Sequence, residues 1–144
     1  MFFGEFQYRV DDKGRMPIPP RFRRELRDGL ILMAGVEKCL TAYSLSEWKK
    51  LSTAPALATP GSITSEKMRR LNRFLYSTAF SLLIDGQGRI SLPAPLKEYA
   101  GITDEVVLTG VNNYIEIWNK EQWETEKALV REQAWQIIEG LERH

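Results

Sequence analysis

The sequence reads VDDKGRMPIP at residues 10–19 and IDGQGRISLP at residues 84–93. Both stretches contain an apolar residue, an aspartate, a glycine, an arginine, a second apolar residue and a proline, in the same register and 74 positions apart. Agreement at so many positions with one fixed offset indicates an internal duplication. We therefore expect two equivalent halves, each containing an Asp-x-x-x-Arg turn.

The residues of each stretch predict the shape of its turn. Gly14 and Gly88 directly precede the arginines, and a glycine permits the positive φ that a tight turn requires. Asp11 and Asp85 can accept hydrogen bonds from the amides of the turn or from the guanidinium. Each turn should therefore hold its arginine in one pose at the beginning of a strand.

A second repeated feature predicts the start of a helix in each half. Ser44 and Asn119 can cap the first turn, and Glu47 and Gln122 stand three residues later, as in a capping box. Aromatic residues flank both caps with the spacing of a hydrophobic staple: Tyr43 with Trp48, and Trp118 with Trp123. These tryptophans could form a stacking platform for single-stranded nucleic acid, but the staple spacing favours packing in the core or at an interface.

The same pattern predicts an α+β fold in which two barrel-like β units with flanking helices share one core. The expected strands are residues 5–10, a short strand ending at Pro19, 30–35 and 39–43, and in the second half residues 79–84, a short strand ending at Pro93, 106–110 and 114–118. The expected helices are residues 21–27, 65–76, 95–99 and a long one from Lys120. The predicted division is residues 1–52 for the first repeat, 53–76 for a linker and connecting helix, and 77–144 for the second repeat with its terminal helix.

Composition argues against several classes of protein. The chain has no apolar run of the roughly 20 residues that span a bilayer, and its first residues do not form a recognisable signal peptide. Its one cysteine, Cys39, cannot form an internal disulfide, which suits a reducing compartment. Its one histidine is His144, and no cluster has the spacing of a zinc site or of a phosphate loop. We therefore predict neither an enzyme nor a metal or cofactor protein, and no small-molecule substrate.

Charge is distributed unequally along the chain. The net charge is +1, but residues 1–73 carry 14 Lys and Arg against 8 Asp and Glu, whereas residues 74–144 carry 6 against 11. A basic half allows one face to meet phosphates. Around the first turn the sequence is rich in candidate DNA-binding cations, namely Arg9, Lys13, Arg15, Arg21, Arg23, Arg24 and Arg27.

The sequence leaves two interpretations of the Asp-x-x-x-Arg pairs open. A pre-ordered arginine can meet a phosphate or a guanine edge, or the ion pair can be only a brace for the turn. Near the second turn the sequence offers only Arg89 and Lys97. We therefore expect Arg15 to contact DNA, and Arg89, with Asp85, to be mainly structural.

At these residues the chain resembles the MraZ family, a tandem form of the SpoVT/AbrB-like swapped-hairpin fold. The resemblance covers nearly the whole chain. It is carried by MFFG at residues 1–4, both Asp-x-x-Gly-Arg turns with Pro19 and Pro93, and GVNNYIEIW at residues 110–118. Pro17 departs from a regular strand, because it lacks an amide donor, and predicts an edge or a bulge there.

The resemblance implies a sequence-specific transcription factor of the cytoplasm and nucleoid. Such proteins bind short direct repeats in double-stranded DNA upstream of their own division and cell-wall gene cluster, typically as repressors, and assemble into rings. It implies that Asp11 and Arg15 form the first family motif, and Asp85 and Arg89 the second. Independently of the resemblance, the aromatic residues Phe2, Phe3 and Phe6 suggest contacts with a neighbouring subunit. The alternatives are a non-specific nucleoid protein and a pure assembly scaffold.

Overall fold

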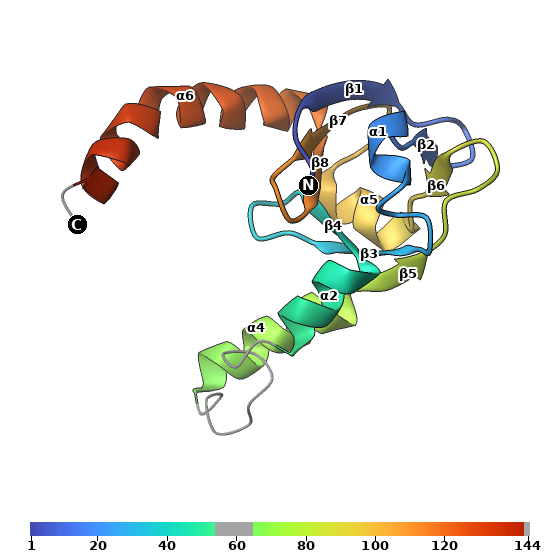
Figure 1. Cartoon of the computed structure of the whole chain (residues 1–144), viewed down its shortest axis with the longest axis horizontal. Helices are drawn as coiled ribbons and strands as arrows, with labels where there is room; N and C mark the ends of the chain where they lie inside the picture. Colours follow the sequence, from blue (N-terminus) through green and yellow to red (C-terminus); the bar gives the residue numbers. More distant parts are fainter. Residues whose placement is uncertain (54–64, 143–144) are drawn as a thin grey trace.

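The computed structural model describes residues 1–53 and 65–142, which form a six-stranded antiparallel sheet, a two-stranded ribbon and flanking helices (Figure 1). The order along the sheet is β1 (Glu5–Arg9), β7 (Glu105–Gly110), β8 (Ile115–Asn119), β4 (Leu40–Ser44), β3 (Leu30–Ala34) and β5 (Phe80–Leu82). The ribbon consists of β2 (Arg15–Pro17) and β6 (Arg89–Ser91). The α+β class is confirmed. The barrel-like unit is open, because within the described residues β1 and β5 end the sheet.

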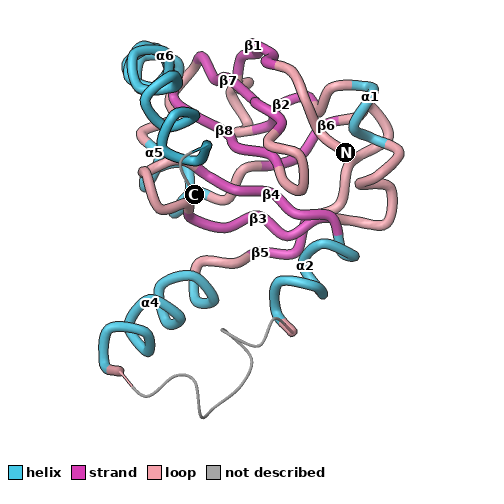
Figure 2. Tube along the Cα trace, turned by 60° about the vertical axis from the view of Figure 1, so that its left-hand side comes forward, coloured by secondary structure: helices cyan, strands magenta, loops and turns pink. Residues whose placement is uncertain are grey.

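Five helices accompany the strands of the described part of the chain. They are α1 (Pro20–Arg23), α2 (Leu45–Ser52), α4 (Glu66–Ser77), α5 (Ala94–Ala100) and α6 (Lys120–Glu142). Figure 2 shows α2 and α4 on the β5 side of the sheet and diverging from one another, and Figure 1 shows α6 extending away from the sheet. None of these helices combines the length and the apolar character that crossing a bilayer would need.

The two halves exchange their first strands. β1 of the first half pairs with β7 of the second half, where Phe6 is opposite Leu108. Reciprocally, β5 of the second half pairs with β3 of the first, where Ile31 is opposite Ser81. The strand order is therefore symmetric about the central β4–β8 pair. This exchange is the swapped arrangement that the resemblance to the SpoVT/AbrB-like fold implied.

The ribbon lies on the same pseudo-twofold axis. Its central pair, Met16 and Ile90, occupies equivalent positions of the repeat, and both side chains are buried. Beyond the ladder the backbone of Ile18 donates a hydrogen bond to the carbonyl of Gly88 (2.8 Å). In a two-stranded ribbon both strands are edges, so Pro17 is tolerated as expected.

One hydrophobic core lies between the sheet and the ribbon. It is built from side chains of both halves at equivalent positions, such as Ile18 with Leu92 and Phe22 with Leu96. Burying a large apolar side chain contributes about 1.5–3 kcal/mol. The core therefore stabilises the two halves as one unit. The predicted domain boundaries remain a prediction.

Both predicted helix caps form. The Ser44 hydroxyl accepts from the Glu47 amide (3.2 Å), and the Asn119 side chain accepts from the Gln122 amide (3.1 Å). The staple rings also meet, with centroids 6.2 Å apart for Tyr43 and Trp48 and 5.7 Å for Trp118 and Trp123. The reciprocal arm of the capping box is not found in either half of the described chain; the Glu47 carboxylate accepts from Lys50 instead (3.1 Å).

Two predicted elements are shorter than expected. Helix α1 ends at Arg23, and turns follow in which the amides of Arg27 and Gly29 bond the carbonyls three residues back, at 3.4 and 3.0 Å. The tighter path keeps Leu26 buried with Phe22. Strand β5 covers only residues 80–82, the length that pairs with β3. The connecting helix is confirmed, whereas residues 54–62 of the predicted loop lie outside the described part.

Candidate nucleic-acid interface

The first Asp-x-x-x-Arg turn is held together by its aspartate. One carboxylate oxygen of Asp11 accepts from the backbone amides of Lys13 (2.9 Å) and Arg15 (2.8 Å). The other accepts from Nε of Arg15 at 2.9 Å. Gly14 adopts a φ of 78°, in the left-handed region that glycine tolerates best. The local sequence is therefore sufficient to fix the pose of Arg15.

The second turn repeats this geometry. Asp85 accepts from the amides of Gln87 (2.9 Å) and Arg89 (2.9 Å) and from Nε of Arg89 (3.0 Å). The φ of Gly88 is 77°. The two turns thus match bond for bond, as the duplication predicted.

The carboxylates of both turns are stabilised in their ionised form. The backbone amide of Arg15 is the main cause of a lowered pKa at Asp11, and the amide of Arg89 has the same effect at Asp85. Each arginine uses Nε to bind its aspartate, and no partner for its terminal nitrogens is found among the described residues. The side chains of Arg15 and Arg89 are 29% and 25% exposed. One guanidinium can therefore brace the turn and still donate outward.

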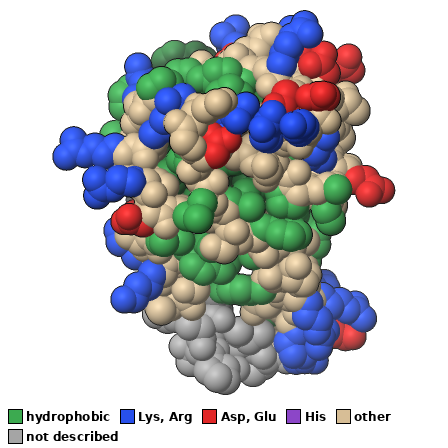
Figure 3. All heavy atoms as spheres, turned by 90° about the vertical axis from the view of Figure 1, so that its right-hand side faces the viewer, with side chains coloured by type: hydrophobic (Ala, Val, Ile, Leu, Met, Phe, Trp, Pro, Cys, Tyr) green, Lys and Arg blue, Asp and Glu red, His purple; other side chains and the backbone are tan. Residues whose placement is uncertain are grey.

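Both loops lie at one end of the molecule, next to the ribbon (Figure 1). Figure 3 shows this end from the outside, with Lys and Arg side chains spread over much of its upper part and a few acidic side chains between them. Lys13 and Arg24 are exposed. Exposed cations beside ordered turns can bind the phosphates of a DNA duplex.

Two other predicted cations are engaged within the chain. Arg9 lies near Asp104 and Glu105, with nitrogen–oxygen distances of 3.5 Å to each carboxylate, so acidic groups surround its charge. The guanidinium carbon of Arg21 lies 4.9 Å from the ring centroid of Phe3 and 5.5 Å from that of Phe6. Arg9 and Arg21 are thus placed less freely for a polyanion than Lys13.

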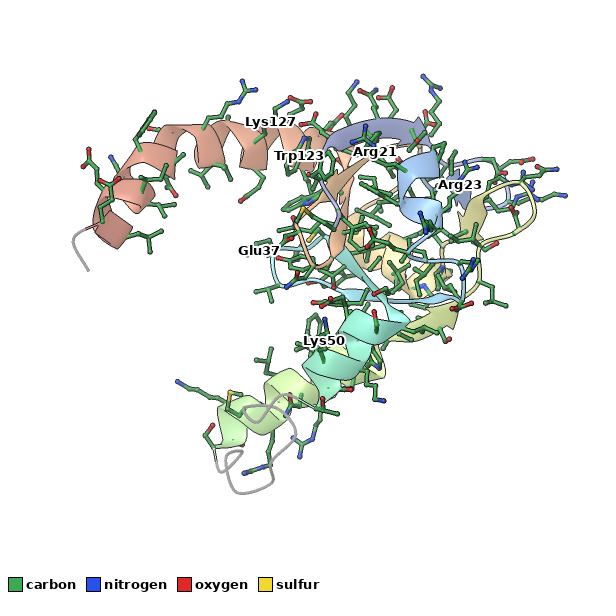
Figure 4. The ribbon with its side chains drawn as sticks, viewed as in Figure 1. Arg21, Arg23, Glu37, Lys50, Trp123 and Lys127 are labelled. Carbon is green, nitrogen blue, oxygen red and sulfur yellow. The ribbon has the colours of Figure 1, made fainter. Side chains whose placement is uncertain are left out.

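Arg23 lies beside the second loop, which corrects its sequence-based assignment to the first. Its Nε donates to the carbonyl of Ile18 (2.9 Å), and its guanidinium covers Gly88, where any Cβ would overlap it. Figure 4 shows Arg21 on the β1 side of α1 and Arg23 on the β6 side. A recess of about 260 Å³ is lined there by Arg23, Arg27, Ile84, Asp85, Gly86 and Gly88. The second loop is therefore basic, because its cations come from the other half.

The structure also assembles a cluster that the sequence did not reveal. One possible ligand atom from each of Glu37, Cys39 and Glu116 lies within 4.8 Å of the others, because β4 and β8 are neighbours. Burial raises the pKa of the Cys39 thiol to about 12 and also raises the pKa of Glu116. Without a metal the thiol is therefore protonated near neutral pH, and a metal would have to displace this proton in order to bind.

The fold and the loops define a class of protein: a tandem duplication whose halves exchange strands and present two matched Asp-x-x-x-Arg turns at one end. The family model described as "MraZ protein, putative antitoxin-like" matches residues 1–62 and 75–136. The chain belongs to the MraZ family.

Close relatives match over the full length. Proteins named transcriptional regulator MraZ from two strains of Dehalococcoides mccartyi are 58% and 59% identical, over 100% and 99% of both chains. The protein of that name from Herpetosiphon aurantiacus is 43% identical over 87% of this chain and 85% of its own.

Proposed function

We propose that this protein is a sequence-specific DNA-binding regulator of transcription. The main observation behind this proposal is the pair of matched turns. In each turn an aspartate orients the arginine through its Nε, which leaves the terminal guanidinium nitrogens available to hydrogen-bond DNA. Arginine binds guanine edges and phosphates in a bidentate manner. Relatives that match the whole chain are named transcriptional regulators, which supports the proposal.

The finer proposal follows from membership of the family. The protein binds short direct repeats upstream of its own division and cell-wall gene cluster and represses that cluster, in the cytoplasm on the nucleoid. A single turn reads few base pairs, since one arginine discriminates a base by about 1–3 kcal/mol. Repeated operator sites compensate for this small footprint when several subunits bind together.

We propose that the subunits form a closed ring, which links the binding of one operator repeat to the binding of the next. Linked sites gain avidity by factors of about 10²–10⁴ without new contacts. Of the three N-terminal phenylalanines, Phe2 is buried against Phe22 of the same chain and Phe6 is half-buried against it, whereas Phe3 is 57% exposed and free to meet a neighbouring subunit. Large apolar side chains on α6 are also exposed, with Trp135 at 74% and Leu141 at 71%. Such exposure favours burial by another copy.

The alternative is a scaffold or non-specific nucleoid protein in which both Asp–Arg pairs are only braces. The observation in its favour is that both ion pairs form within the chain, at 2.9 and 3.0 Å. In that case the terminal nitrogens of the arginines would meet water and no DNA.

A gel shift on the protein's own upstream region, with scrambled DNA as competitor, separates these functions. The proposal expects retention of the upstream fragment at competitor levels that abolish binding to scrambled DNA. Equal competition by both DNAs would establish the non-specific alternative. Light scattering at micromolar concentration tests the ring, and a monomer there would contradict it.

A further inference from the structure

Two cations at equivalent positions of the repeat each reach across to the loop of the opposite half. Arg23 and Lys97 are 74 residues apart, the same offset as the two turns. The guanidinium of Arg23 covers Gly88 of the second loop. The ammonium of Lys97 would lie 3.8 Å from a Cβ at Gly14 of the first loop. The exchange of strands thus has a counterpart in the exchange of side chains.

We propose that Arg23 and Lys97 bind DNA phosphates, each as part of the reading loop of the other half. This inference rests on the proposed DNA binding and adds to it a composite site: the base-reading arginine comes from one half and the phosphate anchor from the other. The pairs are Arg23 with Arg89, and Lys97 with Arg15.

The surroundings of Arg23 suit a phosphate anchor. Its Nε is fixed on the carbonyl of Ile18 (2.9 Å), and the amide of Ile18 is itself fixed on the carbonyl of Gly88 (2.8 Å). No partner for its terminal nitrogens is found in the described part of the chain, so both can donate to one phosphate. Because Gly88 has no side chain, the guanidinium lies directly over the loop backbone.

The two composite sites differ in strength. Arg27 lines the same recess as Arg23, so the second loop has two guanidinium groups from the first half. The position equivalent to Arg27 is Gly101, which leaves Lys97 as the corresponding cation at the first loop. An ammonium is a point charge, whereas a guanidinium binds phosphate as a fork. We therefore expect the second loop to be the stronger phosphate anchor.

A double-mutant cycle on the full-length protein tests the crossed pairing. Affinities for the upstream fragment and for random duplex are measured for Arg23→Ala, Lys97→Ala, Arg15→Ala and Arg89→Ala and for their pairwise combinations, over a range of salt. Arg23→Ala should weaken both DNAs alike, roughly tenfold. Its loss should also lower the salt dependence by about one counterion for each bound subunit.

The pairing itself is decided by the combinations. Arg23→Ala should be non-additive with Arg89→Ala by about threefold or more, and additive with Arg15→Ala. Lys97→Ala should show the opposite preference. Wild-type affinity in Arg23→Ala, or equal coupling to both arginines, would overturn the crossed site. If the wild-type protein itself showed no preference for the upstream fragment over random duplex, the proposed function would be refuted instead.

Two controls separate phosphate binding from folding. Arg23→Lys keeps the charge and should restore most of the affinity for random duplex, while a purely structural Arg23 would gain nothing from an ammonium. Arg70→Ala removes an exposed arginine of α4 that pairs with Glu66 (2.7 Å), and it should leave the DNA affinity within about twofold of wild type. Thermal unfolding and light scattering on each variant establish that the fold and the assembly are intact.

Discussion

The two Asp-x-x-x-Arg loops of this protein have nearly identical internal hydrogen bonds but different surroundings. Within each turn, one aspartate accepts the same three hydrogen bonds, and one glycine has a φ of 78° or 77°. Around them the similarity ends: Arg23 and Arg27 approach the second loop, and Lys97 approaches the first. A short motif therefore fixes how an arginine is held, whereas the topology of the chain fixes what charge surrounds it.

This difference reverses an argument drawn from the sequence. Residues 21–27 follow the first turn along the chain, so the sequence alone places their charges beside it. In the structure, the chain after β2 passes along the second loop, because β2 and β6 pair antiparallel across the pseudo-twofold axis. The expectation that the second loop lacks basic surroundings is wrong for this reason.

The largest expected effect comes from removing the arginine of each turn. Arg15→Ala should lower the affinity for the upstream fragment at least tenfold, since a lost base contact costs about 1–3 kcal/mol. Given its basic surroundings, Arg89→Ala should cause a loss of similar order. Measured ratios of specific to random affinity at fixed salt decide the comparison. If Arg89→Ala lowers only the thermal stability, the second loop is a brace and the two loops are functionally distinct.

Alanine at the two glycines should sharpen the comparison. Gly14→Ala forces a side chain into the left-handed region, at about 1–2 kcal/mol, and its Cβ would meet the Lys97 side chain at ordinary contact distances. Gly88→Ala carries the same strain and also displaces Arg23 from Ile18, which adds about 1 kcal/mol. Denaturant unfolding should show the larger loss for Gly88→Ala. In an Arg23→Ala background the two losses should become equal, and a persistent gap would argue against the overlap.

The aspartates should behave alike in both loops. Backbone hydrogen bonds hold the pKa of Asp11 and Asp85 below the usual value of 3.8, so their stabilising effect is present at higher pH and is lost as the pH falls through the lowered pKa. Carboxyl-carbon NMR during an acid titration should find both groups titrating below the ordinary range. A normal value at one of them would show that its turn is open in solution.

The smallest effect is expected from a chelator. The thiol of Cys39 is protonated near neutral pH, and its cluster with Glu37 and Glu116 lies at strands β4 and β8, in the middle of the sheet. Dialysis against a chelator should leave the affinity of the protein for DNA unchanged. Loss of binding that zinc restores would reveal a metal dependence that the protonated thiol does not predict.

Sequence reasoning succeeded where the signal is local or repeated. The turns, the helix caps and the staples each depend on residues within five positions of one another, and the fixed offset predicted a pseudo-symmetric α+β fold. It failed where residues distant in the chain meet. The crossed position of Arg23, the burial of Phe2 against Phe22 and the meeting of Cys39 with Glu116 all depend on which strands pair. Two signals could have suggested the crossing: the resemblance to a swapped-hairpin fold, and the match of Arg23 with Lys97 at the repeat offset.

The β2–β6 ribbon, which joins the two loops, also determines the distance between them. Only three residue pairs, centred on Met16 and Ile90, form its ladder. A slip of one strand by two residues would move one loop by about 6.8 Å relative to the other. That displacement equals roughly two base-pair steps of duplex. The packing of the buried pair Met16 and Ile90 therefore fixes the distance between the two loops, and with it the spacing of the DNA sites that one subunit can contact.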